Sequence, residues 1–359
     1  MKQKTIQPED MPGNYLKYTG RKTIVIIILV ALVGGMGIFA ICAGSAELTP
    51  GQVVMTLLGK GSENFEIVIW NIRLPRVIAA IVAGAGLSVA GCVMQNILRN
   101  PLADSFTLGI SQGAAFGAAF AIVILGVGTV QTSSTDAVLI NNPYLVTISA
   151  FVFSMVATTV ILFLSSFVGV TPEGMILAGV ALGSLFTAAT TLIQYFAEDV
   201  KIAAIVFWTF GDLGRASWRD TGLIGALVLL AVIYFMLHRW DYNALASGEE
   251  TAKGLGVDVH RLRLGGMAIS SLISAVAVAF LGIIGFIGLV APHMMRRFIG
   301  GDHRFLIPGA TIMGCLLLLA ADTLARTIIK PIILPVGAVT SFLGAPLFLY
   351  LLSRGFKRK

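Results

Sequence analysis

Long uncharged stretches recur along almost the whole chain. Ten can be marked out, at 24–43, 77–98, 106–130, 144–168, 174–196, 221–238, 264–281, 283–295, 305–325 and 335–352. Most approach the roughly 20 residues that an α-helix needs to cross the hydrocarbon core of a bilayer. Only 12% of the 359 residues are charged, well below the share that is usual in soluble domains. The sequence therefore predicts an all-α membrane protein with about ten transmembrane helices.

Small residues are spaced for close packing of these helices. The chain has 40 glycines, and Gly109, Gly113 and Gly117 recur at every fourth position of the third stretch. This spacing lets helix backbones approach closely in lipid, so we expect the stripe to serve packing rather than chemistry. The eighth stretch, 283–295, is short and interrupted by glycine. We expect it to form a broken or re-entrant helix that is buried among its neighbours.

Basic residues are distributed unevenly between the two sides of a ten-span chain. If both termini lie on one side, that side receives about two thirds of the 25 lysines and arginines. Cytoplasmic loops of membrane proteins carry this excess, so both termini are predicted to be cytoplasmic. The expected organisation is a cytoplasmic N-terminal tail (1–23), a single transmembrane domain (24–352) and a basic cytoplasmic C-terminal tail (353–359).

Three arginines fall on the external side in this arrangement, although they are far apart in the sequence: Arg73, Arg76 and Arg326. External arginines either anchor helix ends at the lipid headgroups or meet an acidic partner. Asp322 is the one ionisable residue well inside a predicted span, four residues before Arg326. It is either a proton-coupling carboxylate or part of a structural ion pair with Arg326. The ion pair is favoured, because a neighbouring arginine would hold the carboxylate ionised.

The largest predicted cytoplasmic loop covers residues 239–263. It mixes both signs of charge with apolar residues, and glycines at 248, 254 and 256 divide it. Two short amphipathic helices joined by a glycine turn would fit this pattern, and a solvated loop is the alternative. Because its apolar residues would otherwise be exposed, we expect the loop to be a docking surface.

Motifs for catalysis and for nucleotide binding are absent from the sequence. There is no G-x-x-x-x-G-K-[ST] loop, no H-E-x-x-H motif and no dinucleotide fingerprint. The histidines and cysteines lack the spacing of a metal site, so no catalytic residue, metal or cofactor is predicted. The net charge of +7 follows from membrane orientation and does not indicate nucleic acid. These features predict a non-enzymatic conduit that is driven by partners on both of its faces.

Several stretches carry a family resemblance. The chain resembles the membrane-spanning permease of ATP-binding-cassette (ABC) importers for iron-siderophores and vitamin B12. The matching segments are RLPR at 73–76, VAGCVMQNILRNPLADSFTLGISQGA at 89–114, SGEETAKGLGV at 247–257, GIIGFIGLVAPHMMRR at 282–297, GDHRFLIPGA at 301–310, AADTLART at 320–327 and LPVGAVTSFLGAPLFLYLL at 334–352. They follow the family's order from the second span to the end of the chain.

The resemblance implies a transporter made of several subunits. The expected partners are a second permease subunit (identical or related), two ATP-binding-cassette ATPase subunits, an external substrate-binding protein (a lipoprotein or a periplasmic protein) and the surrounding membrane lipid. The implied location is the cytoplasmic (inner) membrane of a bacterium. An iron(III)-siderophore is the favoured substrate, and haem and cobalamin are alternatives on the same machinery. A proton-coupled secondary transporter that uses Asp322 is the alternative from another class.

The resemblance also implies roles for individual residues. Arg73, Arg76 and Arg326 look like the arginines that receive acidic residues of the binding protein. The residues that would couple to the ATPase are Ser247, Gly248, Glu249, Ala252, Leu255, Gly256 and Val257. Those on the translocation path would be Thr171, Gly179, Gly183, Pro335 and Gly337. One departure is visible, because the family commonly has an acidic residue before Leu-Pro and this chain has Ile333 there.

Overall fold

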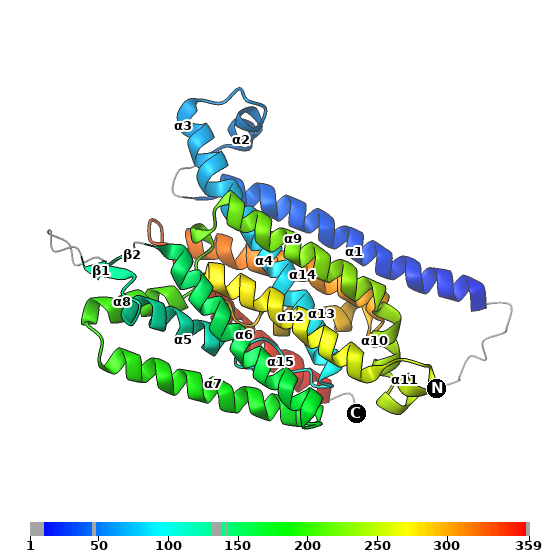
Figure 1. The fold of residues 1–359 in the computed structure, drawn as a ribbon. Helices are drawn as coiled ribbons and strands as arrows, with labels where there is room; N and C mark the ends of the chain where they lie inside the picture. Colours follow the sequence, from blue (N-terminus) through cyan, green and yellow to red (C-terminus); the bar gives the residue numbers. More distant parts are fainter. Residues whose placement is uncertain (1–10, 45–47, 131–137, 141, 357–359) are drawn as a thin grey trace.

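A computed structural model describes residues 11–44, 48–130, 138–140 and 142–356. Helices run side by side along one common direction and form an elongated bundle (Figure 1). Each of the ten predicted stretches contains a helix, and these helices are α1 (Met11–Cys42), α4 (Leu74–Ile97), α5 (Ile110–Val123), α6 (Pro143–Phe167), α7 (Pro172–Tyr195), α9 (Trp218–Leu237), α12 (Val259–Leu281), α13 (Ile287–Ile299), α14 (His303–Thr327) and α15 (Val336–Phe356). Within the described residues, seven helices are long and apolar enough to cross a membrane. The all-helical transmembrane architecture is therefore confirmed, and the number of crossings stays a prediction.

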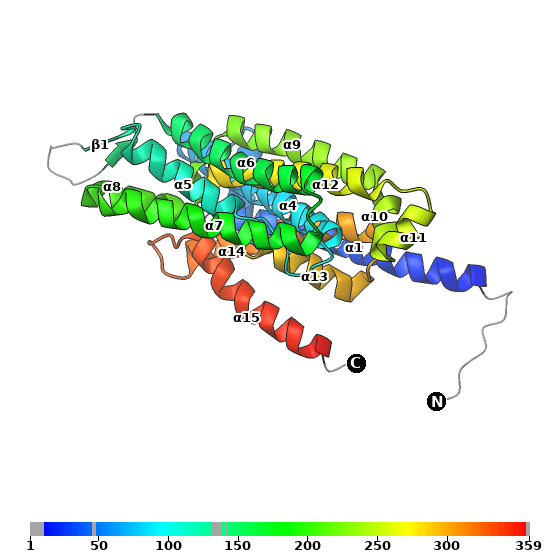
Figure 2. The ribbon, with the colours of Figure 1, turned by 60° about the horizontal axis from the view of Figure 1, so that its bottom comes forward.

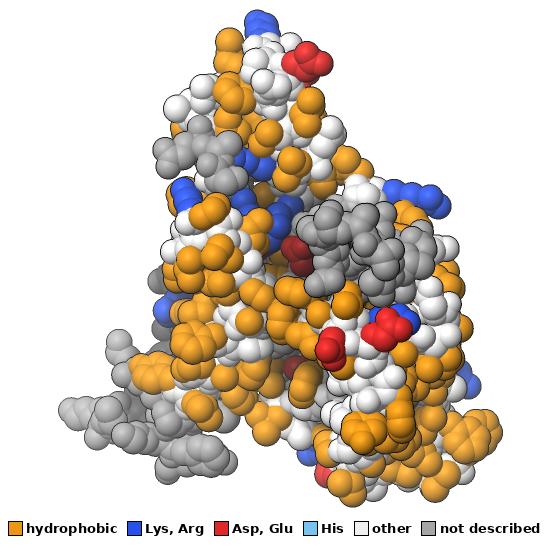
Figure 3. All heavy atoms as spheres, turned by 90° about the vertical axis from the view of Figure 1, so that its left-hand side faces the viewer, with side chains coloured by type: hydrophobic (Ala, Val, Ile, Leu, Met, Phe, Trp, Pro, Cys, Tyr) orange, Lys and Arg blue, Asp and Glu red, His pale blue; other side chains and the backbone are white. Residues whose placement is uncertain are grey.

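Shorter elements connect these helices. They are α2 (Pro50–Leu57), α3 (Glu63–Glu66), the π-helical segment η2 (Ile67–Arg73), strands β1 (Gly128–Val130) and β2 (Val138–Ile140), α8 (Asp199–Thr209), the 3₁₀ turn η3 (Leu213–Arg215), α10 (Arg239–Ala246) and α11 (Glu249–Gly254). The two strands pair antiparallel, with Gly128 opposite Ile140. α2 and α3 project sideways from one end of the bundle (Figures 1 and 3). α10 and α11 lie at the opposite end.

Helix α4 occupies the centre of the bundle. Nearly all of its residues are buried, and it packs against α9, α12, α13 and α14. Two glycines make this packing possible. A side chain at Gly84 would collide with the Gly314 carbonyl of α14, and one at Gly91 would collide with the Gly288 carbonyl of α13. Backbones therefore touch directly on two sides of α4, as small residues permit in membrane bundles.

Glycine positions explain where two predicted helices differ from the sequence pattern. The stretch 106–130 is helical only over α5, because Gly109 has a left-handed backbone with φ of 75° and begins the helix late. The stretch 283–295 is interrupted as predicted: residues 282–286 are not helical, and Gly282 and Phe286 both have positive φ. Glycine adopts such φ values without steric cost, whereas phenylalanine does so only under constraint.

The predicted packing role of the glycine stripe is confirmed for α5 and α6. A side chain at Gly113 would lie 2.7 Å from the Phe153 carbonyl oxygen, and one at Gly117 would lie still closer to the Ser149 carbonyl oxygen of α6. The Ser149 hydroxyl donates a 2.7 Å hydrogen bond to the Gly117 carbonyl at this contact. Within the predicted N-terminal tail, α1 begins at Met11 and continues without a break into the apolar stretch. The cytoplasmic location of this tail stays a prediction. Residues 1–10 and 357–359 of the predicted tails lie outside the described residues.

Candidate functional site

A cluster of charged side chains joins three helices at the end of the bundle that is opposite α10 and α11. Arg76, in the first turn of α4, donates from Nε to Asp322 Oδ1 at 2.9 Å, and its Nη2 lies at the same distance from that oxygen. Arg326, one turn beyond Asp322 on α14, donates from Nε to Asp322 Oδ2 at 2.9 Å. Asp322 has no exposed surface. Both of its oxygens are therefore occupied by guanidinium groups inside the protein.

The same cluster holds the end of α1. Arg326 donates from Nη1 to the Ala43 carbonyl at 2.9 Å and from Nη2 to the Ala40 carbonyl at 3.1 Å. Arg73 donates from Nη1 to the carbonyls of Ile41 and Cys42. The last carbonyls of a helix lack partners within the helix and carry its negative dipole end, so cations are favourable there. The arginines thus satisfy the C-terminal end of α1 while they neutralise Asp322.

The structure brings the three predicted docking arginines together, as the charge count suggested, but it places them inside the bundle. Each is less than 10% exposed. Figure 3 looks onto this end of the molecule and shows basic side chains recessed at the foot of the projection formed by α2 and α3. Asp212, in the loop before η3, approaches Arg76 to 3.5 Å and is the more exposed carboxylate of the cluster. Sequence spacing gave no signal for Asp212. The docking role of the arginines stays a prediction.

The structure contains the two short helices that were predicted in the loop 239–263. α10 and α11 are joined through Ser247 and Gly248, and Gly248 has a φ of 127° that favours glycine. The two helices differ in how far they are buried in the bundle. Tyr242 and Leu245 of α10 are fully buried in the bundle, whereas on the α11 side Ala252 is buried and Leu255 is 69% exposed.

One acidic residue of α11, Glu249, pairs with the bundle in addition to the buried Ala252. Glu249 forms an ion pair of 3.1 Å with Arg263 of α12 and one of 3.2 Å with Lys253 on its own helix. Partial burial alone would raise the pKa of Glu249, but its bonds to Arg263 and Lys253 outweigh burial and lower the pKa. The remaining surface of α11 is polar apart from Leu255. Exposure of this apolar side chain beside charged residues suits a partner protein.

The predicted path residues divide into two groups. Gly179 and Gly183 of α7 are buried against the segment that begins α5, and Gly337 of α15 is buried against the backbone of Phe210 and Ile283. These three glycines are packing positions. Thr171, which caps α7, is exposed, and Pro335 is half-buried.

One whole face of α7 lies uncovered beside the packed glycines. Helix α7 runs along the lower edge of the bundle in Figure 1 and lies on the near side in Figure 2. Its exposed residues include Leu177, Val180, Ala181, Ser184, Leu185, Ala188, Thr191 and Leu192. No charged residue occurs between Glu173 and Glu198. The hydroxyls of Ser184 and Thr191 donate to carbonyls of their own helix, at 3.0 Å each. This face is therefore uncharged and only weakly polar.

Helix α15 offers a second uncovered face. Figure 2 shows it leaving the bundle, so that most of the helix stands apart from the others. Phe342 and Leu349 are among its large exposed side chains. A cavity of about 480 Å³ lies beside its first turns, lined among others by Asp104, Phe106, Phe210, Phe286 and Ser341. Asp104 is buried and caps the backbone amides of Phe106 and Thr107. No sequence pattern indicated this role for Asp104.

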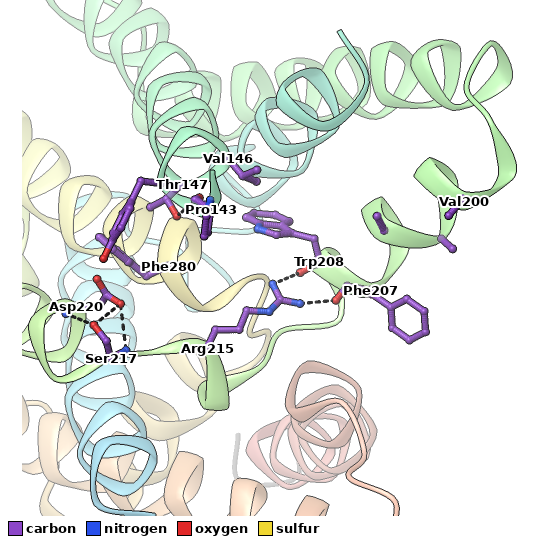
Figure 4. Close-up of a pocket in the computed structure, with 13 residues that line it drawn as sticks. Pro143, Val146, Thr147, Val200, Phe207, Trp208, Arg215, Ser217, Asp220 and Phe280 are labelled. Atoms are coloured by element: carbon purple, nitrogen blue, oxygen red, sulfur yellow. Dashed lines mark hydrogen bonds between the residues drawn. The ribbon is translucent and has the colours of Figure 1, made fainter. Parts of the chain in front are cut away.

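A larger cavity of about 800 Å³ lies between the start of α6, α8 and the start of α9 (Figure 4). Its charged groups already have partners. Arg215 donates to the carbonyls of Phe207 and Trp208, and Asp220 and Ser217 form the N-terminal cap of α9. Most of the remaining lining is apolar. Among the described residues, no group of three or more histidine, cysteine or acidic side chains could hold a metal ion.

Comparison with known proteins identifies the family. The profile of the FecCD transport family matches residues 26–354. A protein of Methanocaldococcus jannaschii that is named as an ABC transporter permease is 57% identical over 97% of this chain and 99% of its own length. The hemin transport system permease of Yersinia pestis is 42% identical, covering 80% of this chain and 83% of its own. The Fe(3+)-citrate import system permease of Bacillus subtilis strain 168 is 35% identical, covering 92% and 95%.

A solved structure agrees with these relatives. A metal-chelate type ABC transporter in an inward-facing conformation superposes with a TM-score of 0.77 and 28% identity, covering 92% of this chain and 99% of that one. The uncovered faces of α7 and α15, the exposed end of α11 and the multiple apolar helices all suit one subunit of a larger membrane assembly. The chain is a multi-pass membrane protein that belongs to the FecCD transport family of ABC importer permeases.

Proposed function

We propose that this chain forms half of the translocation path of an ABC importer for an iron(III) chelate. The uncovered face of α7 carries this proposal. It crosses the bundle without a charged residue, and the hydroxyls that it carries are bonded to their own helix. Such a wall offers passage but no strong binding site, so recognition and energy must come from other subunits. A second permease subunit would cover the faces of α7 and α15, and the path would run between the two.

The substrate class rests on the relatives. The two permeases from Yersinia pestis and Bacillus subtilis are named for hemin and for Fe(3+)-citrate, which both present chelated iron. An iron(III)-siderophore is the substrate that we propose for this chain. Haem is the second candidate, because the hemin permease has the higher identity of the two. Alternating access of the two subunits, in the cytoplasmic membrane of a bacterium, would carry the ligand inward.

The arginine cluster and the coupling helices would meet the partners. In this proposal Arg73, Arg76 and Arg326 receive carboxylates of an external binding protein. Until that protein docks, Asp322 holds the side chains of Arg76 and Arg326 in place. The segment from Ser247 to Val257 would sit in a cleft of the ATPase subunit. A proton-coupled mechanism at Asp322 is disfavoured, since a proton could reach this carboxylate only after two buried ion pairs had been broken.

Uptake by the reconstituted transporter tests the proposed function. Proteoliposomes would hold this chain with its ATPase and its binding protein. They would be offered radiolabelled iron as ferrichrome or hemin, or radiolabelled cobalt as cyanocobalamin. We expect accumulation of the siderophore that needs internal ATP and persists when the proton gradient is collapsed. Accumulation of hemin alone would select the second candidate. Uptake that needs the proton gradient instead of ATP would contradict the proposal.

The docking role of the arginines is tested separately, by the affinity of an Arg326→Gln variant for the binding protein. Unchanged affinity would contradict that role.

Replacing Leu255 by aspartate should weaken the association with the ATPase. Leu255 is 69% exposed at the end of α11, so in the assembly it would enter an apolar pocket of the partner. Loss of an interface anchor costs about 2 kcal/mol or more, which corresponds to roughly a 30-fold weaker complex. Co-purification and binding titrations with the ATPase measure this effect. Arg261→Gln is the control, because Arg261 is exposed but lies outside the proposed docking segment, and this variant should bind normally. Normal binding by the Leu255→Asp variant would remove α11 from the interface.

A further inference from the structure

A buried polar joint fastens α10 to the transmembrane helices. It consists of Asn96 in the last turn of α4, Asn243 of α10 and His303 at the start of α14. Asn96 Nδ2 donates to the Tyr242 carbonyl of α10 at 3.0 Å and lies 2.8 Å from His303 Nε2. Asn243 Oδ1 accepts from the His303 backbone amide at 2.7 Å and lies 3.0 Å from His303 Nδ1. Three helices that are distant in sequence therefore meet at one imidazole.

The backbone fixes the chemistry of this joint. A carbonyl partner requires Asn96 to present its NH₂ group, and an amide partner requires Asn243 to present its oxygen. His303 must then accept at Nε2 and donate from Nδ1, which is the arrangement of a single neutral tautomer. Asn243 also donates from Nδ2 to Asp302 at 2.9 Å. Although burial would raise the pKa of Asp302, bonds from Arg304 and Asn243 hold that pKa at about 2.

A second contact leads from α11 to the same end of α4. Arg263, in the first turn of α12, is buried and donates from Nη2 to Glu249 at 3.1 Å. Its Nε donates to the Ile97 carbonyl of α4 at 3.3 Å. Ile97 directly follows Asn96, so both coupling helices are tied to the final turn of α4. α10 is bonded to this turn directly through the Asn96 amide, and α11 is connected to it through its ion pair with Arg263.

The far ends of α4 and α14 are also joined to each other. Arg76 begins α4 and Asp322 lies near the end of α14, and the two form the buried ion pair of the arginine cluster. Midway, the Ser88 hydroxyl donates to the Ala310 carbonyl at 2.6 Å, beside the direct backbone contact of Gly84 and Gly314. The two helices lie side by side through the centre of the bundle (Figure 1). They are thus connected at both ends and in the middle.

We propose that α4 and α14 move as one rigid strut that links the arginine cluster to the coupling helices, and that Asn96, Asn243 and His303 are the positioning residues that fasten α10 to it. The strut is about 36 Å long at the rise of an α-helix, enough to connect the two faces of a membrane. Displacement of α10 by the ATPase would then shift the arginine cluster. Conversely, binding of the external protein at the arginine cluster would shift α10 and so act on the ATPase through the same pair of helices, because coupling between two binding sites is reciprocal. The inference rests on the proposed function.

Loosening the joint should uncouple the two faces without separating the subunits. The test uses the complete complex in proteoliposomes, with Asn243→Ala on α10 and Asn96→Leu on α4 as independent variants. Basal ATP hydrolysis, its stimulation by the loaded binding protein, the affinity for that protein and thermal stability are measured. We expect association and basal hydrolysis close to wild type in both variants. Stimulation by the binding protein should fall at least about fivefold, which is the lower range of measured coupling between sites.

Matched variants and outcomes decide between coupling and mere stability. Arg261→Ala removes an exposed ion pair at the same end of α12, outside the strut, and should leave stimulation unchanged. Normal stimulation in both joint variants would overturn the strut proposal. Loss of ATPase association in Asn243→Ala would also overturn it, because the joint would then be needed to hold the ATPase rather than to transmit its movement. If the wild-type complex neither associates with an ATPase nor responds to a binding protein, it is the proposed function that fails.

Discussion

Replacing Asp322 by asparagine should destabilise the folded chain by about 3–5 kcal/mol, the usual cost of removing one partner from a buried ion pair. The carboxylate has no exposed surface and takes one guanidinium on each oxygen, at 2.9 Å. Asparagine keeps the shape but leaves Arg326 without its buried counter-charge and Arg76 with only the more distant and more exposed Asp212. Thermal unfolding of the purified complex and the amount of protein inserted in the membrane both measure this loss.

A second carboxylate on the same arginine supplies the control for Asp322. Asp212 lies 3.5 Å from Arg76, but 45% of its side chain is exposed. Ion pairs open to water contribute about 0–1 kcal/mol, so Asp212→Asn should leave stability almost unchanged. A stable Asp322→Asn variant that inserts normally and fails only in transport would contradict the structural role. That outcome would favour the proton-coupled alternative.

The helices were largely predictable because membrane spans leave a strong local signal. Each uncharged stretch contains a helix, and the close packing expected of the glycines at 109, 113 and 117 is found, with Gly109 against α7 and Gly113 and Gly117 against α6. The two helices of the loop 239–263 were also visible, because polar, apolar and glycine residues alternate there over a few positions. These features depend on residues close together in the sequence, where period and composition are sufficient.

Contacts between distant residues were only partly predictable. The pairing of Asp322 with Arg326 follows from their spacing of four residues, but Arg76 lies 246 residues away and joins the same carboxylate. The count of basic residues on each side could place these arginines on one side of the membrane. It could not show that they would be buried and bonded to the last carbonyls of α1. Helix α8 and the hairpin of β1 and β2 were missed because short elements have little periodicity. Asn96, Asn243 and His303 carried no signal, since a buried amide resembles a surface one in sequence.

Replacing Gly91 by alanine should destabilise the chain by about 1–3 kcal/mol, the range observed when a close-packed core is overfilled. A methyl group there would overlap the carbonyl and Cα of Gly288 on α13. Backbone atoms of two helices cannot rotate aside as a side chain can. α4 also cannot retreat from α13, because Gly84 already touches the backbone of α14 on another side.

The same substitution at Gly222 should be harmless, and the comparison isolates the cause. Gly222 lies within α9 and has no atom within 4 Å of an added Cβ. Alanine is favoured over glycine inside a helix by about 0.5–1 kcal/mol, so Gly222→Ala should raise thermal stability or leave it unchanged. Equal stability of the two variants would show that α13 can move away from α4. It would then also free the Gly288 carbonyl, which accepts a 3.2 Å hydrogen bond from Gln95 of α4, and α13 could no longer be counted among the fixed neighbours of that helix.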